Sequence, residues 1–139
     1  MIISCYSILT GGILTCGMIV FHLFFPKVFR WDGDLPKVSS LNRRVIFTIH
    51  LALLLTFLIF AWLSFIYTEE LAACDGLAFG ITLSIALFWL WRAIWQVVYF
   101  SPFFKGRSRV MKRVHILVGI FFMALSAAYS IPVVQRILK

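Results

Sequence analysis

The amino-acid sequence predicts an all-α integral membrane protein, a bundle of four transmembrane helices. Of its 139 residues, 63% are hydrophobic and only 13% are charged, and the mean hydropathy is +1.01. An average soluble domain is about half apolar and a quarter charged, so this composition leaves too little polar surface to face water. Four apolar runs each reach the roughly 20 residues that a helix needs to cross a hydrocarbon core of about 30 Å. Helices are expected because exposed backbone groups cannot stay unpaired in lipid.

The four predicted helices lie at about residues 2-25, 45-68, 75-104 and 109-135. They account for most of the chain, so residues 1-139 are expected to form a single membrane domain. The first run has no charged side chain before Lys27. It lacks the basic start and the cleavage site of a secretory signal, and we expect it to be retained as a helix.

Local signals agree with these four boundaries. Pro26 is expected to end the first helix, because proline cannot donate a backbone hydrogen bond. Serine, threonine and aspartate suit the position before a helix, where the side chain accepts a backbone N–H. Candidate caps are Ser39 or Ser40 for the second helix, Thr68 or Asp75 for the third and Ser108 for the fourth. Ser101 and Pro102 should end or kink the third helix.

The charged residues divide the connections into two kinds. Ten of the 13 basic residues lie in two loops, residues 26–44 and 101–113, whereas the hairpin between the second and third helices carries Glu69, Glu70 and Asp75 and no base. By the positive-inside rule, both basic loops are cytoplasmic and both termini lie outside. We therefore expect a multi-pass protein of a membrane such as the bacterial cytoplasmic membrane.

The excess of basic residues also bears on binding partners. The formal net charge is +8. In so apolar a chain, this charge indicates an anionic membrane surface and control of topology, and no nucleic acid is expected as a partner. The expected partners are the lipid bilayer, an anionic lipid or lipid-soluble ligand, and either a second copy of the chain or a larger membrane complex.

Three histidines fall on the polar stripes of three predicted helices. Small and hydroxylated residues at alternating steps of three and four place His22, His50 and His115 on the faces that should meet other helices. All three lie near the expected cytoplasmic ends of their helices. The sequence thus predicts a histidine cluster that acts as one site in the cytoplasmic half of the bundle.

The third helix adds a charged residue to this half. Arg92, Gln96 and Tyr99 share one face, and Arg92 lies eight residues before Phe100, or about 12 Å along a helix. An arginine inside a membrane costs at least about 2.5 to 3.5 kcal/mol, so it usually has a partner or a function. No Asp or Glu lies inside any span, which leaves helix carbonyls, polar neighbours, headgroup phosphates or an external anion as partners. Toward the other end, Gly76 and Gly80 have the spacing that allows close helix approach.

We therefore expect a polar pocket formed by six residues: His22, His50, Arg92, Gln96, Tyr99 and His115. The first functional hypothesis is a binding or complex subunit whose pocket holds an anionic lipid or a cofactor, with Arg92 gripping the anion through two hydrogen bonds. The second is an electron-transfer subunit with haem b between two histidines. The third is a small membrane enzyme that uses histidine acid–base chemistry on a lipid-soluble substrate.

A metal site is the least favoured alternative. The histidines His22, His50 and His115 have the right chemistry for zinc or iron. However, Arg92 and the basic loops make the local potential positive, no carboxylate is near, and the sequence has no His-x-x-x-His or Glu-x-x-His motif. The main expectation is therefore that the pocket holds no metal ion.

Overall fold

The computed structural model describes residues 1–104, 106 and 108–139, and these residues form helices and short connections. The four long helices are α1 (Ile2–Leu23), α4 (Ser40–Ile66), α6 (Gly76–Val98) and α8 (Arg109–Ile137). Each is long and apolar enough to cross a membrane. This confirms the predicted all-helical class and is the arrangement expected of a multi-pass membrane protein.

Short helices connect the long ones. Between α1 and α4 lie α2 (Phe25–Val28), α3 (Trp31–Asp34) and the 3-10 turn η1 (Leu35–Lys37). Helix α5 (Thr68–Ala73) joins α4 to α6, and α7 (Ser101–Phe104) follows α6. The acidic hairpin between the second and third spans is therefore partly helical, which its sequence pattern did not predict.

The observed helix ends differ from the predicted ones for local reasons. Helix α4 begins at Ser40, five residues before the predicted start at 45, because the Ser39 hydroxyl accepts the Asn42 backbone N–H at 3.3 Å. The first turn of α4 is polar, so the prediction from the apolar run did not include it. Ser108 caps α8 in the same way, through the backbone N–H of Met111 at 3.4 Å.

The third helix is shorter than the predicted range of 75-104. Helix α6 ends at Val98, and Ser101 begins the separate short helix α7 with Pro102 as its second residue. Proline has no N–H and its ring collides with the preceding turn, so it ends a helix before it. Asp75 stands at the start of α6, but its carboxylate binds Arg136 at 2.8 Å instead of capping the helix.

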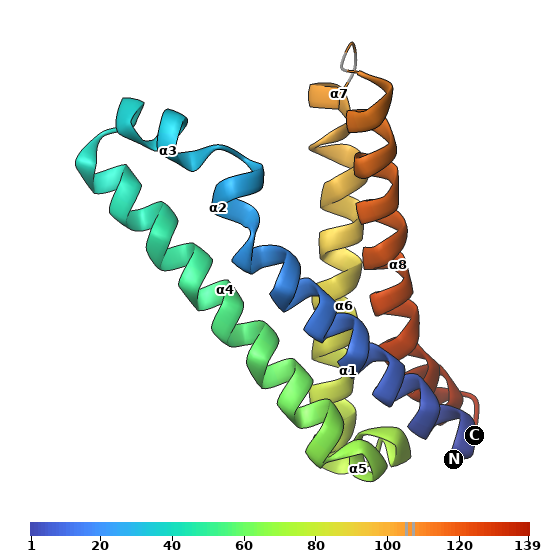
Figure 1. Cartoon of the computed structure of the whole chain (residues 1–139). Coiled ribbons are helices and arrows are strands. Elements are labelled where there is room, and N and C mark those ends of the chain that lie inside the picture. Colours follow the sequence, from blue (N-terminus) through green and yellow to red (C-terminus); the bar gives the residue numbers. More distant parts are fainter. Residues whose placement is uncertain (105, 107) are drawn as a thin grey trace.

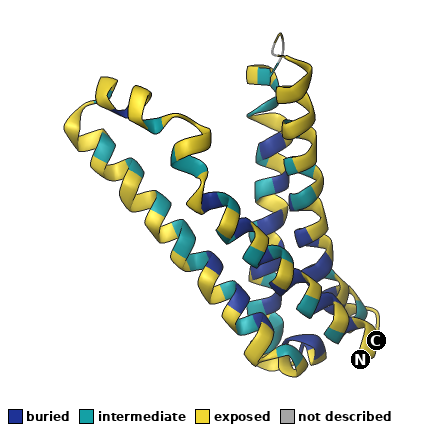
Figure 2. Cartoon of the chain, in the orientation of Figure 1, coloured by how far each residue is buried: buried dark blue, intermediate teal, exposed yellow. Residues whose placement is uncertain are grey.

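The four long helices form a wedge of two arms (Figure 1). The first arm is α1 packed along α4, and the second arm is α6 packed along α8. The arms meet at the closed end, where α5 and both termini lie, and separate toward the open end, which carries α2, α3 and α7. Buried positions concentrate toward the closed end (Figure 2).

The core lies where the two arms meet. Its largest fully buried side chains are Trp89, Tyr129, Phe57 and Phe122. Trp89 lies between two of these rings, with centroids 5.1 Å from Phe57 and 6.0 Å from Phe122. Gly80 does not form the close helix contact that its spacing suggested, because a side-chain carbon built there meets no atom within 4 Å. The arms are therefore joined by aromatic packing and not through this glycine.

Candidate functional site

A cleft of about 400 Å³ lies between the two arms, toward the open end. The first arm and its connection contribute His22, His50, Phe25 and Trp31, and α6 contributes Phe88, Trp91 and Arg92. The remaining wall is aliphatic, formed by residues of α4. The cleft is thus an apolar and aromatic space that also contains two imidazoles and one guanidinium.

His22 is positioned by the last turn of α1. Its side chain is buried, and its Nδ1 lies 3.0 Å from the carbonyl oxygen of Met18. A carbonyl oxygen only accepts hydrogen bonds, so Nδ1 carries a proton and donates it. In the neutral ring, Nε2 is then left with a free lone pair, the state that suits a hydrogen-bond acceptor or a metal ligand.

His50 lies beside His22 on the neighbouring helix. The two imidazole centroids are 5.9 Å apart, and the Trp31 indole packs against His50 at 5.0 Å. Phe25 contacts both histidines, at 5.0 Å from His22 and 5.9 Å from His50. The short helices α2 and α3 therefore hold aromatic rings over the histidine pair and form the outer wall of the cleft.

Arg92 enters the cleft from the second arm. It lies six residues before the end of α6 at Val98, or about 9 Å along the helix axis. Its guanidinium carbon is 4.9 Å from the centroid of the Phe122 ring, a cation–π contact. Within the described part of the chain, no carboxylate and no hydrogen-bond acceptor pairs with this guanidinium.

Gln96 and His115 form a separate pair within the second arm. The Gln96 amide nitrogen lies 2.9 Å from Nδ1 of His115, and Nε2 of His115 lies 3.1 Å from the Ser101 hydroxyl. The amide N–H can only donate, so Nδ1 accepts and Nε2 carries the proton that bonds to Ser101. Phe104 stacks on the same imidazole at 4.5 Å. His115 thus fastens α7 to α6 and α8, and both of its nitrogens are used.

Tyr99 lies outside the cleft. Its side chain is 62% exposed, and its ring stacks on Trp95 with centroids 4.9 Å apart. The structure therefore brings together His22, His50 and Arg92, joins Gln96 to His115, and leaves Tyr99 on the outer surface. Among the described residues, no group of three or more histidine, cysteine or acidic side chains is placed to hold a metal ion, so the three histidines do not form the metal site considered as an alternative.

The sequence pattern missed the aromatic part of the site. Phe25 and Trp31 belong to the connection after α1, where a tryptophan near a helix end suggests only an interfacial anchor. Trp91 lines the cleft although it is 55% exposed, whereas the neighbouring Trp89 is completely buried. The density of aromatic residues around Arg92 in the sequence was the one indication of an aromatic site. It does not show which of these rings point into the cleft.

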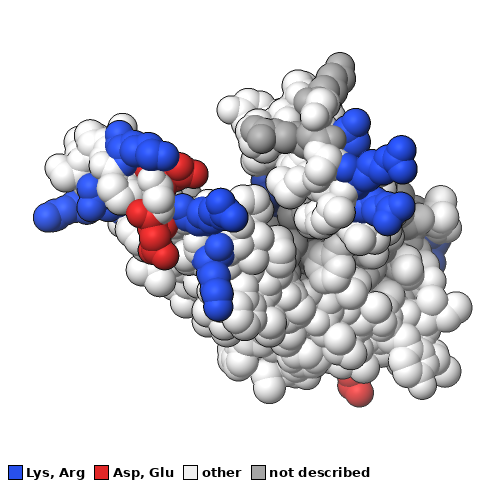
Figure 3. Space-filling model, turned by 45° about the horizontal axis from the view of Figure 1, so that its top comes forward, with Lys and Arg blue, Asp and Glu red and all other residues white. Residues whose placement is uncertain are grey.

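The charges of the described residues lie mainly around the open end (Figure 3). One basic group follows the connection from α2 to the start of α4, and another lies at the start of α8 on the other arm. The described acidic residues of the α5 region lie at the closed end, where Asp75 binds Arg136.

No family model matches the chain, and no curated protein or solved structure matches it. The geometry of the cleft is therefore the basis for a functional assignment.

Proposed function

We propose that this chain is a small multi-pass membrane protein that binds the anionic head of an amphiphile in the cleft between its arms. The observation that carries the proposal is Arg92, a guanidinium in the membrane-spanning part of α6 without a protein anion among the described residues. An arginine at such depth normally pairs with another group. A carboxylate or phosphate suits it because the guanidinium forms two parallel, charge-assisted hydrogen bonds to these groups.

The other walls of the cleft support the same ligand class. His22 and His50 line the cleft, and the free Nε2 of His22 can accept a hydrogen bond from a hydroxyl of the head, such as the P–OH of a singly ionised phosphate monoester. Phe25, Trp31 and Phe88 provide apolar surface for the part of the ligand that continues into the bilayer. Ligand sites commonly combine such apolar walls with a few directed polar groups.

The proposed orientation places this cleft in the cytoplasmic leaflet. Basic residues surround the open end, and the α5 region at the closed end carries Glu69, Glu70 and Asp75. The positive-inside rule then puts the open end in the cytoplasm and both termini outside. Basic residues near a membrane surface also raise the local concentration of anionic lipids, and this would increase occupancy of the cleft.

Lipid binding by Arg92 variants tests the proposal. Purified protein is incubated with phosphatidic acid or with phosphatidylcholine, and retained lipid is measured by native mass spectrometry. Arg92→Leu should weaken phosphatidic acid binding by roughly tenfold or more, because charge-assisted hydrogen bonds contribute about 1.5–3 kcal/mol. Arg92→Lys should retain part of the binding, because lysine keeps the charge but not the two-pronged geometry.

The matched control is Arg109→Leu, which removes one exposed positive charge at the start of α8 and outside the cleft. It should bind phosphatidic acid almost like the wild type. Equal weakening by Arg92→Leu and Arg109→Leu would indicate general attraction by surface charge and would contradict the proposed site.

Haem b is the second candidate, because two imidazoles, those of His22 and His50, line the same cleft as Arg92. Haem proteins use such histidine pairs as axial ligands. The absorption spectrum of the purified protein separates the candidates. A Soret band that disappears in His22→Ala and His50→Ala would support haem, whereas Arg92-dependent lipid retention without that band supports the lipid site.

A further inference from the structure

Arg92 and His22 offer a ligand opposite kinds of hydrogen bond. The Arg92 guanidinium has only N–H donors. The neutral His22 ring directs its Nδ1 proton to the Met18 carbonyl at 3.0 Å and so has an acceptor at Nε2. Both side chains line the same cleft. A head that satisfies both groups must therefore carry a negative charge and also a hydrogen-bond donor.

The Nε2 acceptor of His22 is open to the cleft. Among the described residues, the buried side-chain nitrogens that are both unpaired and shielded from solvent are Nε of Arg43 and Nε1 of Trp89. Within the same part of the chain, Nε2 of His22 also has no hydrogen-bond partner, but it is not shielded in this way. The opening that the His22 side chain lines is the cleft, so a ligand atom there can reach Nε2.

The surroundings of His22 favour its neutral ring. Three phenylalanine rings pack around the imidazole, with centroids 5.8 Å away for Phe21, 5.0 Å for Phe25 and 4.9 Å for Phe57. A positive charge on this ring would be buried among apolar groups and would share the cleft with that of Arg92. Nε2 is therefore an acceptor, and the proton of its hydrogen bond must come from the ligand.

We infer that the head is a phosphate monoester that retains one P–OH, the head of a phosphatidic acid. This inference rests on the proposed function, because Arg92 must first hold the anion. A singly ionised phosphate monoester has unprotonated oxygens for the N–H groups of Arg92 and an O–H for Nε2 of His22. His50, whose nitrogens have no partner among the described residues, has one N–H in either neutral tautomer and can donate it to the same oxygens.

Other anionic heads leave the His22 acceptor unsatisfied. A carboxylate and a phosphate diester carry the charge for Arg92 but no O–H on the anionic group itself. Their oxygen lone pairs would face that of Nε2, and an acceptor buried without a donor is unfavourable. A site that hydrogen-bonds a ligand O–H strongly rejects the analogue that lacks it, for the same reason.

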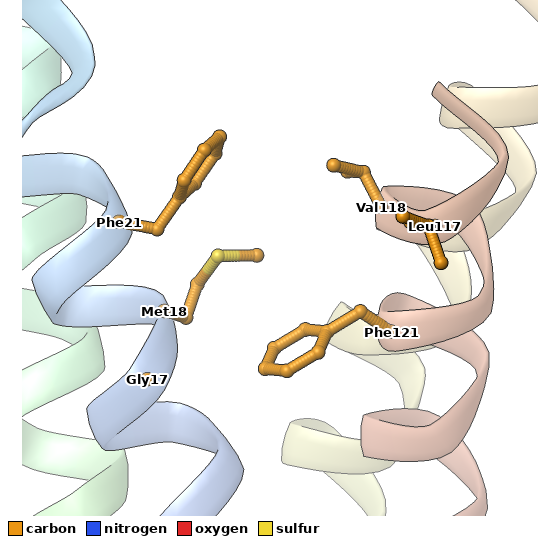
Figure 4. Close-up of a pocket in the computed structure, with 6 residues that line it drawn as sticks. All are labelled: Gly17, Met18, Phe21, Leu117, Val118 and Phe121. Carbon is orange, nitrogen blue, oxygen red and sulfur yellow. The ribbon is translucent and has the colours of Figure 1, made fainter. Parts of the chain in front are cut away.

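The opening between α1 and α8 does not contain such a pair of groups (Figure 4). It has a volume of about 230 Å³. The residues that line it are Gly17, Met18, Phe21, Leu117, Val118 and Phe121. None of these side chains carries a charge, an N–H or an O–H, so the cleft is the opening to which we assign the head.

The experiment compares three lipids that share their acyl chains and differ in the head. Phosphatidic acid has the P–OH, phosphatidylmethanol has a methyl ester in its place, and phosphatidylglycerol has alcohol groups further from the phosphorus. The purified protein is incubated with pairs of these lipids at about pH 5.5. A phosphate monoester loses its second proton near pH 6, so about one charge is then present on each head. Native mass spectrometry measures the ratio of the two bound lipids.

The wild type should prefer phosphatidic acid over both other lipids by roughly tenfold, which corresponds to about 1.4 kcal/mol. His22→Phe keeps an aromatic ring at this position and removes Nε2, so it should bind the three lipids about equally. His22→Gln should keep part of the preference, because its amide oxygen can accept the P–OH proton. The matched control is His115→Phe, the same substitution at an imidazole that is paired with Gln96 and Ser101, and it should keep the wild-type ratio.

Four outcomes would overturn the inference. Equal binding of phosphatidic acid and phosphatidylmethanol by the wild type would mean that Nε2 does not accept from the head, and this comparison holds even if His22→Phe fails to fold. An unchanged preference in His22→Phe would assign the P–OH to another acceptor. Equal binding of phosphatidic acid and phosphatidylglycerol would assign Nε2 to an alcohol group. Displacement of phosphatidic acid by glycerol 3-phosphate would assign the cleft to a soluble phosphate monoester.

Arg92→Leu separates this inference from the proposed function. If Arg92→Leu loses phosphatidic acid and phosphatidylmethanol while the wild type binds the two equally, only the phosphate monoester assignment fails. If Arg92→Leu retains both lipids as the wild type does, the proposed function fails.

Discussion

Buried hydroxyl groups at the closed end of the wedge are paired with one another, whereas Arg92 in the cleft toward the open end has no protein anion among the described residues. At the closed end, the Tyr129 hydroxyl lies 2.7 Å from the Ser64 hydroxyl and 3.4 Å from that of Thr15, so helices α8, α4 and α1 share one buried network. Ser7 donates to the carbonyl of Ala128 at 2.7 Å across the same region. At the open end, Arg92 has a ring beside it but no anion among the described residues.

This difference indicates which polar residues hold the fold and which are available for a ligand. Hydrogen bonds between helices stabilise a bundle in lipid, and the groups at the closed end are paired within the protein. A charge without a protein partner makes no such contribution, because its desolvation is unfavourable. Substitutions at the closed end should therefore reduce stability, whereas Arg92→Leu should fold at least as well as the wild type.

The largest effect on stability is expected where the helices approach most closely. In Gly11→Ala, the new methyl carbon would lie 2.7 Å from ring atoms of Tyr129, a fully buried side chain that has little space to move. Overpacking of this kind typically costs about 1–3 kcal/mol. Thermal unfolding in detergent should show a lower midpoint for Gly11→Ala than for Gly80→Ala, which gains the same helix propensity without a clash. Equal midpoints would mean that the closed end can relax.

A smaller loss is expected from removing one hydroxyl at the closed end. Tyr129→Phe deletes the group that meets Ser64 and Thr15, and a buried hydrogen bond contributes about 1 kcal/mol. Tyr99→Phe is the control, because Tyr99 is exposed and lies outside this network. When unfolding by denaturant is measured in the same detergent, only Tyr129→Phe should have a lower free energy of unfolding than the wild type. A neutral Tyr129→Phe would contradict the view that this network stabilises the closed end.

The smallest expected effect concerns the histidines of the open end. His22 and His50 touch each other and share Phe25, whereas His115 bonds to Gln96 and Ser101 on the other arm. Alanine substitutions at His22 and His50 should therefore be non-additive in unfolding free energy, by about 0.5 kcal/mol or more. His50 and His115 should be additive within about 0.3–0.5 kcal/mol, as independent sites are. Non-additive effects among all three alanine substitutions would instead support the single histidine site that the sequence predicted.

The sequence predicted the helices and the positions of the polar residues along them, because both depend on the order of residues within one helix. Four long apolar runs predicted four spans, and the cap at Ser108 marked the start of α8 as expected. The same reasoning placed His22, His50 and Arg92 near one end of the bundle, where the structure brings them to one cleft. It overestimated the length of the third helix because an apolar run continues through the break before Ser101.

What the sequence by itself determined is therefore the helical class, the four candidate spans and the side of each helix that carries polar groups. These follow from hydropathy and helical periodicity, which are local properties. Only the tertiary structure decided that His115 bonds to Gln96 within the second arm, while His22 and His50 line the cleft with Arg92. The reason is that the angle between the arms depends on packing between helices, through contacts such as those of Trp89 with Phe57 and Phe122. The order of residues along a single helix does not determine this packing.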